Sequence, residues 1–106
     1  MKQKYILMVL FILSISLAHA ADLSGKLSGI PGAEVIVVCT GFNGSTTISS
    51  NGTFLISGLP ANKSCSFTIK KGNSSSVAMP FSTKQSKSFF NGSLRAASNR
   101  IFVILE

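Results

Sequence analysis

Few residues in this chain could carry chemistry. Among 106 residues there are two cysteines and one histidine, and the only acidic residues are Asp22, Glu34 and Glu106. General acid–base catalysis, nucleophilic catalysis and metal binding need a base, paired carboxylates or a cluster of ligands. The serines are plentiful, but the histidine is His19, in the segment that we expect to be removed, and no other base is evident, so we expect solvated strand and loop residues. The composition therefore predicts a protein that is not an enzyme and has no cofactor and no metal site.

The N-terminal twenty residues have the pattern of a signal peptide. Lys2 and Lys4 precede an apolar run that begins at Ile6, and Ala18-His19-Ala20 places small residues at the positions that a signal peptidase reads. We expect cleavage between Ala20 and Ala21, so that residues 1–20 are the signal and residues 21–106 form one domain. An uncleaved anchor is the alternative, but the apolar run is short for a membrane span. The pattern predicts an exported protein, periplasmic or secreted, with no stable membrane span after cleavage.

Cleavage would change what remains for chemistry. His19 and two of the ten basic residues would leave, so the net charge would fall to eight minus three, or +5. Cys39 and Cys65 would both enter an oxidising compartment, where an even count favours one disulfide. Such a bond would stabilise a small domain by about 3–4 kcal/mol. Two free buried thiols are the alternative.

The basic residues lie mostly in the second half of the chain. One interpretation is a patch for an anionic partner, formed by Lys63, Lys70, Lys71, Lys84 and Lys87. The other is a set of ordinary solvated loop residues. Nucleic acid is not an expected partner, because the aromatic residues are chiefly Phe at core positions and are not interleaved with Arg.

Short alternating segments separated by turn residues predict an all-β sandwich. Residues 34–40 are the strongest strand and are apolar on both faces, which indicates a central strand or a second face covered by another element. Asn51-Gly52 predicts a type I′ turn, and the apolar run 101–105 predicts a buried strand. For 82–100 the sequence suggests a hairpin at 89–92 and a helical turn at 94–97. Further strands are expected at 22–28, 45–49, 53–57, 64–71 and 77–81.

Several short motifs occur together in a familiar order. They are Gly29-Ile30-Pro31-Gly32-Ala33-Glu34-Val35, Asn51-Gly52-Thr53-Phe54, Gly58-Leu59-Pro60 and Cys65-Ser66-Phe67-Thr68-Ile69. In these motifs the chain resembles the carboxypeptidase regulatory-like, or transthyretin-like, β-sandwich domains and the related collagen-adhesin B-type domains. Cys65 departs from the pattern, because an aromatic residue usually stands there. The expected fold is a small antiparallel Greek-key β-sandwich of about seven strands.

The resemblance implies that strand 34–40 lies antiparallel beside strand 64–71. If Cys39 faces Cys65, then Val37 faces Phe67, and all four side chains fall on the apolar phase of their strands. A slip of one residue would destroy that agreement. We therefore predict a cross-strand Cys39–Cys65 disulfide.

The functional prediction is an exported binding or structural module without catalysis. Its expected partner is a protein or a carbohydrate-containing surface polymer, contacted through loops or a strand edge. One alternative is an assembly subunit that pairs through an apolar sheet face or the C-terminal strand. A secreted effector or inhibitor that acts by surface binding is the other.

Overall fold

The computed structural model describes residues 20–106, which form nine β-strands and no helix. The predicted signal peptide therefore lies outside the described residues except for Ala20, which opens the first strand. The strands are β1 (Ala20–Ser28), β2 (Glu34–Cys39), β3 (Phe42–Thr47), β4 (Thr53–Pro60), β5 (Ser64–Lys71), β6 (Ser74–Ser75), β7 (Met79–Ser82), β8 (Lys87–Ala97) and β9 (Arg100–Leu105).

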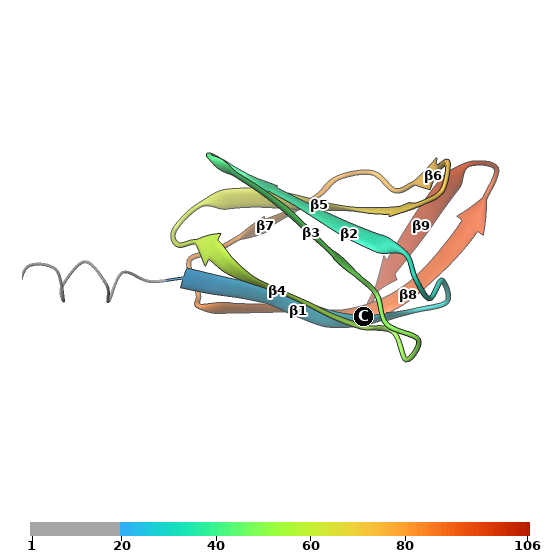
Figure 1. The fold of residues 1–106 in the computed structure, drawn as a ribbon, viewed down its shortest axis with the longest axis horizontal. Helices are drawn as coiled ribbons and strands as arrows, with labels where there is room; N and C mark the ends of the chain where they lie inside the picture. The colour runs from blue at the N-terminus through green and yellow to red at the C-terminus, as the bar shows by residue number, and fades with distance from the viewer. Residues whose placement is uncertain (1–19) are drawn as a thin grey trace, which may run out of the picture.

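The strands join into one sheet that curls into a nearly closed barrel. Their order is β3-β2-β5-β6-β9-β8-β1-β4, and β7 pairs with β5 beside this path. Figure 1 shows β2, β3 and β5 in one layer and β1, β4 and β8 in the other. The all-β prediction is confirmed. The expectation of an antiparallel fold of about seven strands is wrong, because β1–β8 and β6–β9 are parallel pairs and residues 20–106 form nine strands.

The core follows the predicted alternation. Val35, Val37 and Cys39 on β2 are buried, and Val37 packs opposite the fully buried Phe67 of β5. The β2–β5 register is the predicted one, with Cys39 opposite Cys65. Strand β2 is central, as expected, because β3 and β5 flank it. An aromatic cluster extends this core, with the ring of Phe67 centred 5.9 Å from that of Phe81 and 4.9 Å from that of Phe90.

The segment from Asn51 to Pro60 differs from its prediction in two places. Gly52 has a positive φ of 89° but Asn51 does not, so the turn is not type I′. Instead, the Gly52 N–H donates to the Ser49 carbonyl at 2.9 Å, which closes a four-residue turn. Gly58-Leu59-Pro60 does not end the strand. The β1–β4 register shifts between Ala21 and Leu23, and Gly58, with φ of 78°, supplies the conformation that this bulge needs.

The C-terminal region departs furthest from the sequence-based expectation. Residues 87–97 form the single long strand β8, so the hairpin expected at Asn91-Gly92 and the helical turn expected at 94–97 are both wrong. The reversal occurs at Ser98-Asn99, where both residues have positive φ, as a two-residue type I′ hairpin requires. Long-range pairing of β8 with β1 and β9 outweighs the local turn signal of Asn91-Gly92.

Candidate functional site: a forked groove beside the last strand

The two cysteines form the predicted disulfide. Their sulfurs are 2.07 Å apart, and the Cα atoms of Cys39 and Cys65 are 4.2 Å apart across the β2–β5 pair. Both residues are buried within the core cluster. The bond joins two strands of one layer and its two residues are almost fully buried, so its role is structural.

The five lysines of the expected anionic patch fall into two groups. Lys63 and Lys84 lie at the end of the barrel where the β4–β5 and β7–β8 connections meet, and Lys87 opens β8 at the same end (Figure 1). Lys70 and Lys71 end β5, six and seven residues beyond Ser64, with which the strand begins. At about 3.3 Å per residue, roughly 23 Å separates the two groups. The five lysines therefore do not form a single compact patch.

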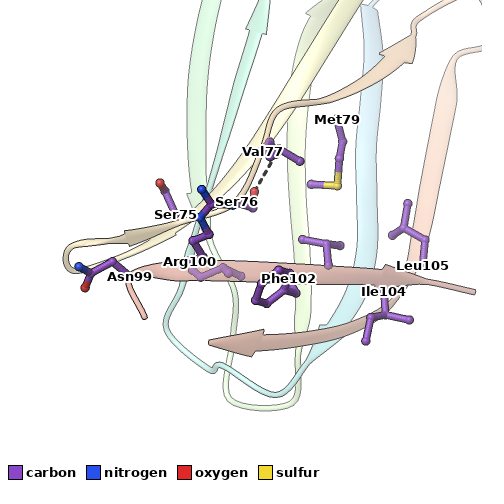
Figure 2. A pocket seen from close by; sticks show the side chains of 11 residues that line it. Ser75, Ser76, Val77, Met79, Asn99, Arg100, Phe102, Ile104 and Leu105 are labelled. Atoms are coloured by element: carbon purple, nitrogen blue, oxygen red, sulfur yellow. Dashed lines mark hydrogen bonds between the residues drawn. The ribbon is translucent and has the colours of Figure 1, made fainter. Parts of the chain in front are cut away.

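A groove of about 780 Å³ lies between β9 and the segment that leads from β6 into β7. On the β9 side it is lined by the run from Arg100 to Leu105, and on the other side by Ser75, Ser76, Val77 and Met79. Figure 2 shows the side chains of Val77 and Met79 across the groove from those of β9. Most of this lining is apolar, and Val77 is 77% exposed. Among the described residues that line the groove, none carries a carboxylate.

The groove exists because the chain pairs with β9 at β6 and then diverges from β9 on its way to β7. The β6 strand pairs with β9 in parallel through the single contact of Ser75 with Arg100. Beyond it, the chain leaves β9 and returns to β5 as β7, with Met79 opposite Phe67. The two arms form a fork that is closed at Ser75 and Arg100 and open toward Leu105. We call this closed end the apex of the fork.

Strand β9 consequently has one satisfied edge and one open edge. It pairs with β8 along its whole length. On its other edge, no strand within residues 20–106 pairs with it beyond Arg100. The expectation of a buried C-terminal strand is therefore wrong. Ile101 is buried, but Phe102, Ile104 and Leu105 are exposed.

The phase of the β8–β9 hydrogen bonds shows which backbone groups are open. The Glu106 N–H donates to the Asn91 carbonyl at 2.8 Å. The direction of the backbone groups alternates along an antiparallel pair. The N–H and C=O groups of Phe102 and Ile104 therefore also point toward β8. Val103 and Leu105 turn both N–H and C=O toward the groove. An unpaired, apolar edge of this kind is a template for another strand.

The sequence indicated part of this open edge. The apolar run from Ile101 to Leu105 identified a strand, and its possible pairing with a neighbour was one of the alternatives. The contributions of Val77, Met79 and Arg100 were missed, because the fork depends on where β6 and β7 attach to the sheet. No local pattern specifies that attachment.

Thr83 is a second residue that the sequence did not single out. It is 2% exposed, and its hydroxyl accepts from the Lys63 N–H at 2.7 Å and donates to the Pro60 carbonyl at 2.7 Å. Its backbone N–H donates to the Lys63 carbonyl at 2.9 Å, and its carbonyl accepts from the Asn62 N–H at 3.0 Å. Thr83 therefore fastens the β4–β5 turn to the chain that follows β7.

Within residues 20–106, His, Cys, Asp and Glu side chains form no group of three or more that could hold a metal ion. The same part of the chain contains no helix long and apolar enough to cross a membrane. Comparisons with protein family models, with curated proteins and with solved structures find no match to this chain. The function is therefore inferred from the groove itself.

Proposed function

We propose that this protein is a small exported binding module without catalysis, which engages a protein partner through the groove beside β9. The observation that carries the proposal is the unpaired apolar edge of β9 facing an open groove. Exposed apolar area of this kind on a small domain is typical of an interaction site. Hydrogen-bonding groups along the same edge would add directional contacts.

Two further features support export. The N-terminal sequence has the signal-peptide pattern described above, and the Cys39–Cys65 disulfide suits an oxidising compartment, periplasmic or extracellular. The disulfide also compensates for a core that is small for an independent domain.

We also propose that the domain, whose strands form one curled sheet, is related to the transthyretin-like and carboxypeptidase regulatory-like β-sandwich domains. The support is the β2–β5 register that the motifs implied, together with the two-layer arrangement of the strands. Gly58-Leu59-Pro60 occupies a bulge next to β1, so this motif has a defined structural role.

The second candidate function is an assembly subunit, and the same edge of β9 favours it. In that case the strand that meets β9 would come from another copy or from a neighbouring subunit. A secreted effector or inhibitor acting by surface binding would use the groove in the same way as a binding module.

Photo-cross-linking tests whether the groove is the contact surface. Phe102 is 49% exposed in the groove, and Phe89 is 67% exposed on the outer face of β8. Replacing each in turn by p-benzoyl-phenylalanine gives a matched pair of probes in the cells that produce the protein. We expect a cross-link to a protein from position 102 and none from position 89.

Three results are informative in different ways. Equal cross-linking from both positions, or none from 102, would contradict the groove as the contact surface. A product of twice the chain mass would favour the assembly function. A cross-linked protein of another mass, identified by mass spectrometry, supports the binding module.

A further inference from the structure

From the geometry of the fork we infer that its occupant is an extended protein segment that adds to β9 as an antiparallel strand, with a carboxylate at its C-terminal end beside Arg100. This inference rests on the proposed function and specifies the chemistry of the partner. Four observations carry it: the direction of the two arms, the open backbone groups, the phase of the side chains and the distribution of charge.

The direction of the occupant follows from the sheet topology. Both β6 and β7 run antiparallel to β5, and β6 runs parallel to β9. The two arms of the fork therefore point the same way, from the apex toward Leu105. A strand lying between the two arms is antiparallel to both when its C-terminal end lies at the apex. Antiparallel pairing is the more stable kind.

The open backbone groups select β9 as the arm that pairs. Val103 and Leu105 direct N–H and C=O into the groove, as the hydrogen-bond phase shows. The opposite arm is a poorer template, because it is irregular between Ser75 and Met79 and contains Pro80, which has no N–H. The occupant therefore extends the β8–β9 sheet and closes the barrel on this side.

The side chains of β9 set the pattern of the occupant. Residues directly opposite each other on paired strands project to the same face. Positions facing Val103 and Leu105 therefore lie toward the interior, near Met79, and favour apolar β-branched side chains. The position between them faces Ile104, which is exposed, and tolerates a polar residue.

Charge favours an anionic end at the apex. Arg100 is there with Ser75, Ser76 and Asn99, and the groove has no carboxylate of its own. The first position past the apex faces Phe102, so a C-terminal carboxylate there would lie next to the Arg100 guanidinium. A second copy is a less suitable occupant, since the chain carries ten basic and three acidic residues.

The probe is the acetylated pentapeptide Thr-Val-Thr-Val-Thr with a free C-terminal carboxylate. It is titrated to millimolar concentration into the ¹⁵N-labelled protein with its disulfide intact. We expect the amide signals of Val103 and Leu105 to shift and their hydrogen exchange to slow at least about tenfold, since each gains a partner. The amides of Phe102 and Ile104, already directed toward β8, should change little in exchange rate.

Chemical variants of the peptide separate strand addition from simple apolar contact. N-methylation of the valine nearer the C-terminus removes an N–H that faces β9 and should weaken binding at least about tenfold. N-methylation of the central threonine alters an N–H that faces away from β9 and should weaken it much less. Replacing the terminal carboxylate by an amide should weaken binding about threefold to tenfold.

A protein variant gives an independent test. Leu105→Pro removes one N–H from the open edge at the last residue of β9, and the β8 ladder does not use that N–H. We expect the folded protein to keep its disulfide and circular dichroism but to lose most of its affinity for the peptide.

The inference is overturned if millimolar peptide leaves Val103 and Leu105 unchanged, or if both N-methylated peptides bind equally. It is also overturned if these amides are already protected without peptide, or if they shift with protein concentration alone, which would indicate a second copy. The proposed function is tested by the cross-linking experiment, independently of the peptide. A cross-link from position 102 together with unchanged Val103 and Leu105 amides would support the groove as an interface and reject strand addition.

Discussion

Thr83 should determine how firmly one end of the barrel is held. In Thr83→Val the hydroxyl is replaced by a methyl group of similar size, so packing is retained while two hydrogen bonds are lost. The Lys63 N–H and the Pro60 carbonyl then have no hydroxyl partner at a partly buried site. A buried polar group left without its partner costs about 1–3 kcal/mol.

The expected loss is at the lower part of that range for each group, because both lie near the surface. We therefore expect Thr83→Val to reduce the free energy of unfolding by about 2–3 kcal/mol. For a domain of this size the loss corresponds to about 10–20 °C in Tm. Thr83→Ser is the matched control, since it keeps the hydroxyl and loses one methyl group, at a cost of about 1 kcal/mol.

Urea unfolding followed by circular dichroism, with the disulfide intact, measures both variants. The unsubstituted protein should be the most stable, followed by Thr83→Ser and then Thr83→Val, with similar m-values. Amide exchange at Lys63 gives a local readout, which should accelerate in Thr83→Val and change little in Thr83→Ser. If Thr83→Val proves as stable as Thr83→Ser, the hydroxyl bonds do not fasten this end of the barrel.

Two further predictions concern the disulfide and the glycines. Replacing Cys39 and Cys65 by Ala should lower the free energy of unfolding by about 3.5 kcal/mol, because the bond closes a loop with a sequence separation of 26. Guanidinium unfolding of the oxidised protein and the variant measures this, and a difference below about 1 kcal/mol would contradict the loop-closure account. Gly25→Ala should destabilise by more than about 3 kcal/mol, because the added Cβ would overlap the carbonyl oxygen of Phe90. Gly44→Ala is its control and should change stability by less than about 1 kcal/mol, since its Cβ would meet only side-chain atoms, at 3.0 Å or more. Thermal unfolding of the two variants distinguishes them. Equal Tm values would show that the backbone around Gly25 shifts to accommodate a Cβ atom.

Much of the layer that contains β2 and β5 could be predicted from the sequence. The alternation in Val35-Ile36-Val37-Val38-Cys39 and in Cys65-Ser66-Phe67 specifies which side chains face the core. The predicted register buries both sets, and a slip of one residue would turn one set to the opposite face. The disulfide follows from that register. The alternation is a local pattern with a period of two residues, whereas the pairing of these two strands was implied by the resemblance described above.

The fork is different in kind. Periodicity tells which face of a strand is buried but does not tell which of its edges is paired. Strand β9 is open along Val103 and Leu105 only because β6 touches it at Arg100 and the chain then turns back to β5 as β7.

The C-terminal strand was thus identified from its sequence as a strand, while its role as an open edge was not. Asn91-Gly92 failed as a turn signal for the same reason, because pairing with β1 and β9 on both sides outweighs the local preference of two residues. The sequence by itself determined which side chains of the disulfide-linked layer face the core, because a strand alternates its faces with a period of two residues. Tertiary structure decided where the sheet is left incomplete, since an unpaired edge is a property of the whole strand order.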